Sequence, residues 1–349
     1  MTEVDHGGEC VTPVEAVKPA SDLSTLDALP FPIWCNDSGN NIPVSASRTE
    51  ACNLYGLRLT TTRTVNGVTT KTGELMMNVY DYEFSSPDLP SWQHQIGVAP
   101  MSGWGDAATA SVSGSMTATN QCTTQGPNTF PIQSLSPTNG VLREGYAGAT
   151  TTATAVGAIG NCTTTWNLVF TTPGYNPVTT TSSLEEVRCD NATGANGARP
   201  ARVGCVVWWF PAQVLYSQSS YPSLASHVSR AQASGLPGAS FAAPLHRTSD
   251  PTRTSTNRNL ACGDAPSIAG LSCDEYPLAS TYEGLASGGT RRTFDNCNIN
   301  APTGVTGPTG ASACMITATE NNAQGGIMVG FYYDNRVLEA DPYRVGVGT

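Results

Sequence analysis

Three carboxylates lie close together in residues 273–284, whose sequence is Cys-Asp-Glu-Tyr-Pro-Leu-Ala-Ser-Thr-Tyr-Glu-Gly. They are Asp274, Glu275 and Glu283, and the turn-forming Pro277 lies between them. Charged residues make up only 13% of the chain, so this group stands out. Carboxylates placed in this way can bind a hard cation or activate a water molecule. Successive residues of a strand point to opposite faces, so Asp274 and Glu275 are expected to differ in role unless the turn brings them together.

Four segments, in the same order within residues 203–345, resemble the NucA/NucB family of secreted, metal-dependent deoxyribonucleases. The most specific is Asp274-Glu275-Tyr276-Pro277 followed by Glu283-Gly284. Nothing before residue 200 takes part in the resemblance, so it gives the N-terminal region no function. The other three segments are Tyr221 to Val228, Leu245 to Gly263 and Glu320 to Gly326.

The resemblance implies a metal-finger-like nuclease, in which a general base on a strand faces a metal ion held by the following helix, often through an asparagine. Placed on this chain, Asp274 is the candidate base or metal-side carboxylate, with Glu275 next to it. Asn321 is the candidate metal ligand, together with Glu320. Carboxylate and amide oxygens suit Mg²⁺ or Mn²⁺ better than Zn²⁺. The implied substrate is DNA.

Two further catalytic candidates each have a structural alternative. Glu283 is a candidate catalytic carboxylate, and it also fits an ordinary solvated side chain before a glycine turn. His227 is a candidate for orienting the phosphate or the site. A single helical histidine is more often a capping or buried hydrogen-bonding residue, so both interpretations stay open.

The substrate-binding candidates are Arg247, Arg253 and Arg258, in a short segment that also holds Thr, Ser and Asn. Guanidinium groups suit phosphate through charge-assisted hydrogen bonds. A solvated loop has the same composition, and an ion pair of Arg247 or Arg258 with one of the adjacent carboxylates is another alternative. Asn322 stands where the bacterial pattern of the family has an arginine, which leaves one expected phosphate contact without its residue.

The net charge of −10 argues against a protein that binds nucleic acid by electrostatics alone, because duplex affinity comes largely from basic side chains on phosphates. Residues 1–200 hold 17 acidic and 8 basic side chains, whereas residues 201–349 hold 10 and 9. The acidity therefore lies mostly outside the nuclease-like region. A metal ion would have to supply part of the positive charge at a phosphate.

Eleven cysteines are spread along the chain without a C-x-x-C pair, which favours disulfides in an oxidising, extracellular compartment over zinc ribbons or redox motifs. No run of about 18 apolar residues occurs, so no membrane span is expected. Sequence alone does not prove the connectivity. Pairing of near neighbours gives Cys35–Cys52, Cys122–Cys162, Cys189–Cys205, Cys262–Cys273 and Cys297–Cys314, with Cys10 left over.

The chain is expected to divide into a tail or linker at 1–30, a β-rich domain of unknown function at 31–195 and the nuclease-like domain at 200–349. Asn66-Gly67 between two alternating segments predicts a β-hairpin, because both residues readily take positive φ. Threonine-rich strands are expected around 111–119, 149–158 and 162–171. After a Gly/Ala/Asn-rich break at 190–200, we expect a buried strand at 203–210, a helix at 222–233, and a closing helix and strand within 325–345.

The predicted fold class is α+β, with an N-terminal β-rich, sandwich-like region followed by a small α+β, metal-finger-like nuclease domain. The predicted function is a secreted, extracellular, divalent-metal-dependent endonuclease that hydrolyses DNA phosphodiester bonds. For the N-terminal region, a cell wall or a protein is the candidate partner. The alternative function is a secreted surface-binding or adhesion-type β protein whose nuclease-like domain is inactive.

Overall fold

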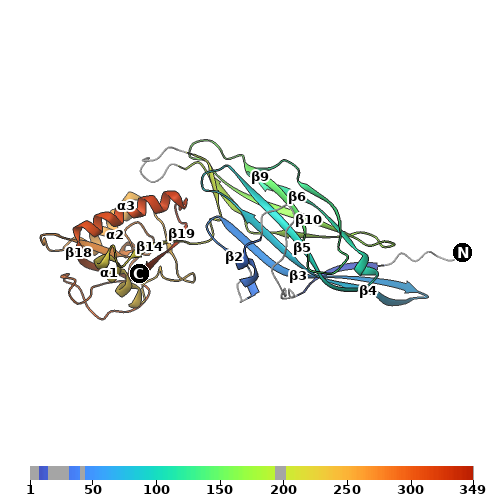
Figure 1. Cartoon of the computed structure of the whole chain (residues 1–349). Helices are drawn as coiled ribbons and strands as arrows, with labels where there is room; N and C mark the ends of the chain where they lie inside the picture. The colour runs from blue at the N-terminus through green and yellow to red at the C-terminus, as the bar shows by residue number, and fades with distance from the viewer. Residues whose placement is uncertain (1–7, 15–30, 40–43, 193–201, 349) are drawn as a thin grey trace. The chain divides into compact units, whose positions relative to one another are not determined.

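The computed structural model describes residues 8–14, 31–39, 44–192 and 202–348. These residues form two compact units (Figure 1). The N-terminal unit comprises the described residues up to Ala192 together with 202–207, and the C-terminal unit comprises 208–348. None of the described helices is both long and apolar enough to cross a membrane.

The N-terminal unit consists of two β-sheets and two short 3-10 helices. The strand order of the first sheet is β1-β3-β4-β5-β9-β7, and β2 also pairs with β3. The order of the second is β13-β12-β10-β6-β8, and β11 also pairs with β10. The first sheet contains β1 (Gly8–Val14), β2 (Ser45–Ala46), β3 (Glu50–Val65), β4 (Val68–Phe84), β5 (Ser91–Gly105), β7 (Cys122–Gln125) and β9 (Arg143–Thr151). The second contains β6 (Ser111–Asn120), β8 (Thr129–Ser134), β10 (Ile159–Thr171), β11 (Val178–Ser183), β12 (Val187–Asp190) and β13 (Gly204–Val206), and the 3-10 helices are η1 (Ile33–Gly39) and η2 (Asp106–Thr109).

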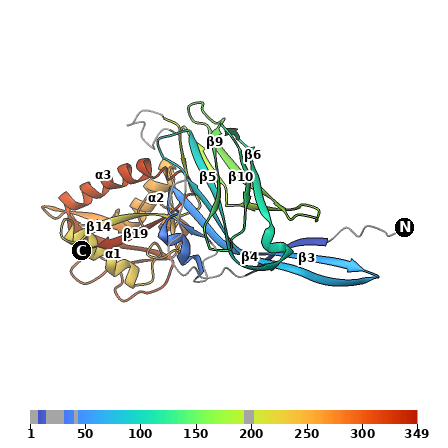
Figure 2. The ribbon, with the colours of Figure 1, turned by 45° about the vertical axis from the view of Figure 1, so that its right-hand side comes forward.

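The predicted hairpin is confirmed as the long pair β3–β4. Its turn residues Asn66 and Gly67 have φ values of 51° and 74°, which match the right-handed twist of the flanking strands. The end of the hairpin projects beyond the other strands of its unit (Figures 1 and 2). Strands were also expected at 111–119 and 162–171, where β6 and β10 lie. Of the strand expected at 149–158, only 149–151 is a strand, and it is the end of β9.

The core of this unit lies between the two sheets. Inward-facing apolar side chains alternate with outward polar ones, as a half-buried strand requires. Leu57, Leu59 and Met77 of the first sheet belong to the same buried cluster as Trp166 and Phe170 of the second. The expected sandwich-like β region is therefore present.

A buried polar network also connects the two sheets. His94 of β5 bonds to Asp81 of β4 through Nε2 and lies 2.8 Å through Nδ1 from Oγ1 of Thr164, on β10 of the other sheet. Ser182 of β11 donates to the second oxygen of Asp81. Both oxygens of the Asp81 carboxylate are thus bonded, and the chain of bonds fixes how the sheets face each other.

Five disulfides are present, and they are the five pairs of near neighbours expected from the sequence. Cys122–Cys162 joins β7 of the first sheet to β10 of the second, over a sequence separation of 40. Cys10 is free and exposed.

Two further expectations about element boundaries are wrong. Gly8–Val14, inside the segment expected as a tail, forms β1 and pairs with β3, while 1–7 and 15–30 lie outside the described residues. Only Gly204–Val206 of the strand expected at 203–210 is a strand, and it belongs to the N-terminal unit. Its Cys205 faces Cys189 in the β12–β13 pair, so the disulfide attaches this segment to the β unit.

The C-terminal unit contains two three-stranded sheets and three α-helices. One sheet has the order β14-β19-β15 and the other β16-β18-β17. Their strands are β14 (Ala212–Ser217), β15 (Leu245–His246), β16 (Leu271–Tyr276), β17 (Thr290–Arg292), β18 (Gly310–Thr317) and β19 (Pro342–Gly348). The helices are α1 (Pro222–Ala233), α2 (Pro251–Cys262) and α3 (Ala318–Asp334), with the 3-10 turn η3 (Leu285–Ser287).

The helices of this unit form for different reasons. The helix predicted at 222–233 is confirmed as α1, which buries Leu224, Val228 and Ala231 at helical spacing. Helix α2 was not predicted, because it has little apolar periodicity; Pro251 begins it, and the Asp250 side chain accepts a hydrogen bond from Thr252 N. The predicted closing helix is α3, and it begins earlier than expected, directly after β18.

Replacing Cys122 and Cys162 together by alanine is expected to lower the free energy of unfolding of the N-terminal unit by about 4 kcal/mol. The reason is that the unfolded chain regains the entropy of a loop with a sequence separation of 40. Thermal and denaturant unfolding of the full chain measure this loss. Cys10→Ser is the matched control and should leave stability unchanged. Unchanged stability of the double variant, or mass spectrometry that finds most cysteines as thiols, would contradict the disulfide assignment.

Candidate active site

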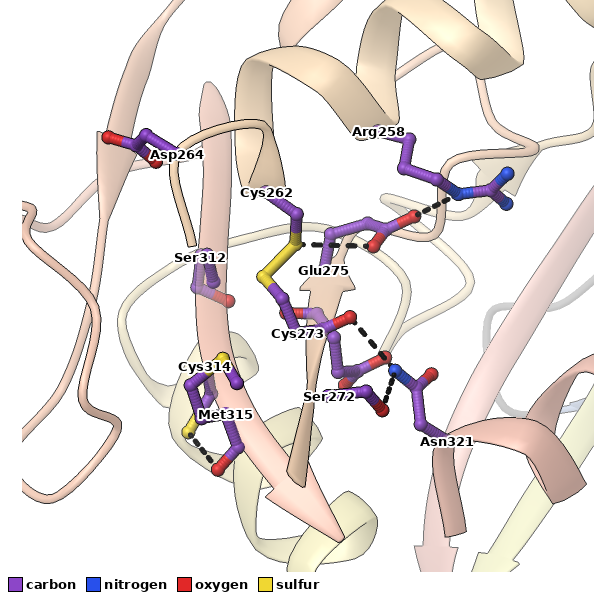
Figure 3. The surroundings of a disulfide bond; sticks show 12 residues. Arg258, Cys262, Asp264, Ser272, Cys273, Glu275, Ser312, Cys314, Met315 and Asn321 are labelled. Carbon is purple, nitrogen blue, oxygen red and sulfur yellow. Dashed lines mark hydrogen bonds and ion pairs between the residues drawn. A yellow bond between two sulfur atoms is a disulfide. The ribbon is translucent and has the colours of Figure 1, made fainter. Parts of the chain in front are cut away.

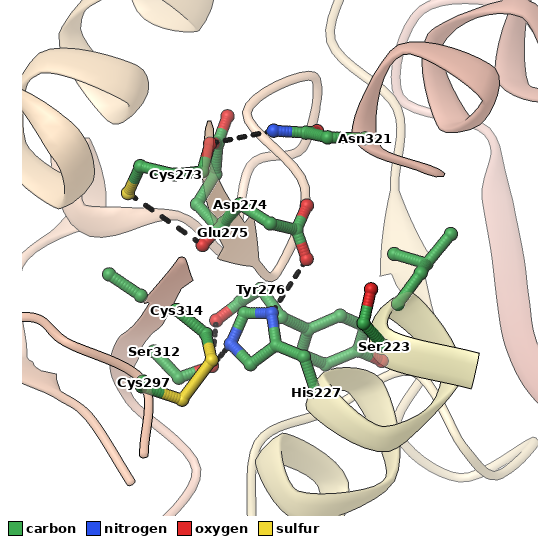
Figure 4. A network of polar contacts seen from close by, with 12 residues as sticks. Ser223, His227, Cys273, Asp274, Glu275, Tyr276, Cys297, Ser312, Cys314 and Asn321 are labelled. Atoms are coloured by element: carbon green, nitrogen blue, oxygen red, sulfur yellow. Dashed lines mark hydrogen bonds and ion pairs between the residues drawn. A yellow bond between two sulfur atoms is a disulfide. The ribbon is translucent and has the colours of Figure 1, made fainter. Parts of the chain in front are cut away.

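Asp274 and Glu275 lie on opposite faces of β16, as the alternation of a strand requires. This strand pairs antiparallel with β18, with Asp274 opposite Cys314 and Glu275 opposite Ala313. Asp274 points toward helix α1 (Figure 4), whereas Glu275 points toward helix α2 (Figure 3). The two adjacent carboxylates therefore have separate surroundings.

A buried hydrogen-bond chain holds Asp274. Its Oδ2 lies 2.6 Å from Nδ1 of His227, and Nε2 of His227 lies 2.9 Å from Oγ of Ser312. Ser312 Oγ also donates to the carbonyl oxygen of Tyr276. An ionised Asp274 accepts the Nδ1–H of the imidazole, so the ring is held in one orientation (Figure 4).

Helix α1 and strands β16 and β18 bring His227, Asp274 and Ser312 together. His227 lies between Leu224 and Val228 on α1, and all three are buried against the core of the unit. Ser312 of β18 faces Tyr276 of β16 across the strand pair. Of the Asp274 side chain only 2% is exposed, and of the His227 side chain none, so the His227 ring has no surface from which to contact a substrate directly.

Among the described residues, nothing bonds to the second oxygen of Asp274, and that oxygen points to the side on which Asn321 lies (Figure 4). Asn321, in the first turn of α3, donates from Nδ2 to Oγ of Ser272 at 2.9 Å and to the carbonyl oxygen of Cys273 at 2.8 Å. Both of these acceptors belong to β16, so they fix the amide beside the strand. The Asn321 carbonyl oxygen has no hydrogen-bond donor within the described part of the chain.

Glu320 has a structural partner in this structure. Helix α1 has no capping side chain of its own at Tyr221, and Oε2 of Glu320 accepts the N–H of Leu224 at 2.9 Å instead. Burial raises the pKa of Glu320, but hydrogen bonds from Leu224, Ser223 and Thr317 outweigh it, so the pKa is lowered. Its negative charge also suits the N-terminus of a helix.

Glu275 forms an ion pair with Arg258, and Nε of Arg258 lies 3.7 Å from its Oε1 (Figure 3). Its Oε2 lies 3.7 Å from Sγ of Cys262, which is bridged to Cys273 and has no proton to donate. Burial and the neighbouring charge of Asp274 raise the pKa of Glu275 to about 7, against the opposing effect of Arg258. Of the two ion-pair alternatives, the structure therefore has the one with Arg258.

The other arginine candidates are occupied by contacts within the unit. Arg247 is 4% exposed, donates to the carbonyl oxygen of Val337 and packs on the ring of Tyr332. This burial arises because Arg247 lies directly after β15, beside the core, rather than in a solvated loop. Arg253 packs on the ring of Tyr282 and donates to Ser287 at 2.9 Å.

Glu283 lies in a different pair. Its Oε1 is 2.7 Å from Nδ1 of His246, and its Oε2 accepts the His246 N–H at 2.9 Å. Among the residues that the structure describes, no hydrogen bond joins this pair to the Asp274 network. Glu283 thus anchors the turn after β16 to β15.

Residues 242–346 match the family model described as Deoxyribonuclease NucA/NucB. The C-terminal region is similar to the NucA/NucB deoxyribonucleases. The expected resemblance is thereby confirmed, and the match includes Asp274, Glu320 and Asn321 but begins after α1, which carries His227. No curated protein and no solved structure matches the chain.

The sequence did not predict two polar contacts of the C-terminal unit. Ser312 gave no signal, since a lone serine in an apolar strand has no characteristic spacing; its role depends on the β16–β18 register. The His246–Glu283 pair was missed because its partners are separated by 36 intervening residues that fold back on each other. Within the described ranges, no group of three His, Cys, Asp or Glu side chains is arranged to hold a metal ion.

The raised pKa of Glu275 predicts a pH-dependent effect of Glu275→Gln. Glu275 has an ordinary pKa of 4.5 and a folded-state pKa of about 7, so the folded chain binds its proton more tightly than the unfolded chain. Its stabilising contribution is complete below pH 4.5 and is lost as pH rises through 7. Glutamine does not ionise, so the variant should become more stable relative to wild type over this window, by up to about 1.4 kcal/mol per pKa unit.

Melting temperatures of both proteins from pH 4 to about pH 8.5 test this expectation. A difference in melting temperature that rises through the window supports it. A constant difference would show that Glu275 ionises as an ordinary glutamate.

Proposed function

We propose that the C-terminal unit is a divalent-metal-dependent endonuclease that hydrolyses DNA outside the cell, with Asp274 as the proton acceptor. The observation that carries this proposal is the state of the Asp274 carboxylate, one oxygen of which His227 holds while the other remains unbonded beside Asn321. The similarity to NucA/NucB deoxyribonucleases supports DNA as the substrate. Five disulfides support an oxidising, extracellular location.

The residues around Asp274 fit Mg²⁺ or Mn²⁺. Such ions use one or two carboxylates, keep several waters and prefer oxygen donors, so a three-ligand cluster of His, Cys, Asp and Glu is not needed. The Asn321 carbonyl oxygen would hold the ion, with Glu320 as a further ligand, and Asp274 would remain beside it as the proton acceptor. Glu320 caps α1 through Oε2, and its carboxylate still has unused lone pairs for an ion. This arrangement, on β16 and on α3 directly after β18, is also what a metal-finger-like domain would require.

The chain's own residues would handle the proton of hydrolysis. The unbonded oxygen of Asp274 accepts a proton from the attacking water as that water forms its bond to phosphorus and the bond to the leaving oxygen breaks. His227 and Ser312 keep the carboxylate in place and stabilise its charge before the proton arrives. A bound cation would add positive charge at the phosphate.

Substrate contact is proposed for two of the three candidate arginines. The Arg258 side chain is 64% exposed, and it lies on α2 with Arg253. To reach a phosphate, Arg258 would give up its 3.7 Å ion pair with Glu275, and Arg253 its contacts with Tyr282 and Ser287. Arg247 is buried, and its guanidinium is committed to Val337 and Tyr332, so we assign it to packing instead.

Plasmid degradation is expected to stop in excess EDTA and to return with Mg²⁺ or Mn²⁺, because the site has too little positive charge of its own to stabilise the phosphate. Asn321→Ala should raise the metal concentration that gives half-maximal activity. Gel analysis of plasmid cleavage across a metal titration measures both effects. Full cleavage in EDTA would refute the metal dependence.

Asp274→Asn is expected to lower turnover by roughly 10²- to 10⁴-fold, the loss typical of a general base, while the fold persists because the side chains match in shape. Asp264→Asn is the matched control, since Asp264 is an exposed carboxylate paired with Arg291 in the same unit. Specific activity and melting temperature are measured on the same preparations. Wild-type activity in folded Asp274→Asn would favour a different base over this mechanism, and no cleavage by the folded wild-type protein with Mg²⁺ or Mn²⁺ would favour an inactive nuclease-like domain.

A further inference from the structure

The N-terminal unit has a cavity that the nuclease proposal does not use. Its volume is about 760 Å³, and residues of β5, β7, β8 and β9 and the turn after β7 line it. The residues that matter for its chemistry are Gln93, Gln125, Gln133, Glu144, Tyr146 and Gly148. All of them belong to the N-terminal unit, so the cavity is complete within that unit.

Strand register builds one wall of the cavity. Gly148 of β9 faces Gln93 of β5 on one side and Gln125 of β7 on the other. A Cβ at Gly148 would lie 3.3 Å from the Gln125 carbonyl oxygen and 3.4 Å from Nε2 of Gln93. The lack of a side chain at Gly148 therefore lets Gln93 and Gln125 approach each other closely across β9 in the cavity wall.

An aromatic ring lies on the same face of β9. Tyr146 precedes Gly148 by two residues, so both point to one side of the strand. Tyr146 is 59% exposed, although its neighbours Gly145 and Ala147 are buried. An exposed ring in the cavity lining offers a flat apolar surface with a polar hydroxyl at its edge.

The charge of the lining restricts the ligand. Glu144 is the only ionisable acid among the described lining residues, and no lysine, arginine or histidine is present. Its Oε1 accepts a hydrogen bond from Gln95, and its backbone bonds to the Gln133 amide. A phosphate or a carboxylate would thus find no positive partner, which excludes nucleic acid and acidic ligands.

We propose that this cavity binds a neutral oligosaccharide. Glutamine amides both donate and accept hydrogen bonds, as the hydroxyl groups of a sugar do. The C–H face of a pyranose ring packs on an aromatic face, which Tyr146 supplies. A concave site with an aromatic wall and a few polar groups is the usual form of a small-ligand pocket. The proposal is independent of nuclease activity.

Isothermal titration calorimetry of the full chain with N-acetylchitotetraose, cellotetraose, maltotetraose and mannotetraose tests the proposal. Tetragalacturonate is the charged counterpart. At least one neutral sugar should bind, and tetragalacturonate should bind more weakly than that sugar. Tyr146→Ala and Gln93→Ala should each weaken binding by about tenfold, as expected for the loss of one good contact.

Trp104→Ala is the matched control, because Trp104 is an exposed aromatic residue, 51% accessible, of the same unit and is absent from the cavity lining. It should leave sugar affinity unchanged. Failure of every neutral sugar to bind at millimolar concentration would overturn the proposal. Equal binding of tetragalacturonate, or affinity that Tyr146→Ala leaves unchanged in a folded variant, would overturn it as well.

Discussion

The hydrogen bond between Asp274 and His227 is the interaction on which the C-terminal site depends. A buried carboxylate without a partner costs several kcal/mol, and so does a buried polar imidazole, so each group requires the other. The bond ties β16 to α1, and Ser312 extends it to β18. Helix α1 can therefore pack on this strand pair in only one register, which also sets the direction of the free oxygen of Asp274.

The N-terminal unit also contains a buried aspartate–histidine pair, but its aspartate has no unbonded oxygen. Asp81 and His94 are fully buried, and Asp81 uses both oxygens, one for His94 and one for Ser182. It has no oxygen left for a water or an ion. Asp274 differs in this one respect, since its second oxygen has no partner among the described residues. The comparison separates a carboxylate that joins two sheets with both oxygens from one that keeps an oxygen without a partner among the described residues.

Features that depend on near neighbours could be predicted from the sequence, and those that depend on distant contacts could not. The Asn66–Gly67 hairpin, the helix at 222–233 and the five disulfides all follow from local patterns. Helix α2 lacks an apolar stripe. Its start is set by the Asp250 cap and by Pro251 rather than by a pattern of buried residues. The segment at 203–210 was assigned to the wrong unit because its alternation of apolar residues does not reveal which strand it pairs with. At the site, the alternation of side chains along a strand correctly predicted that Asp274 and Glu275 have different surroundings. The burial of Arg247 depends on tertiary contacts, so the sequence did not predict it.

The arginines of the C-terminal unit are one reason for proposing a divalent ion. The described part of the C-terminal unit draws its positive charge from arginine, and these side chains already have neighbours. Arg291 pairs with Asp264, and Arg292 is buried among carbonyl oxygens. Arg230 and Arg344 pack on the rings of Phe294 and Phe241. Apart from Arg253 and Arg258, little uncommitted positive charge therefore remains for a phosphate, and the proposed divalent ion beside Asp274 would provide what the side chains do not.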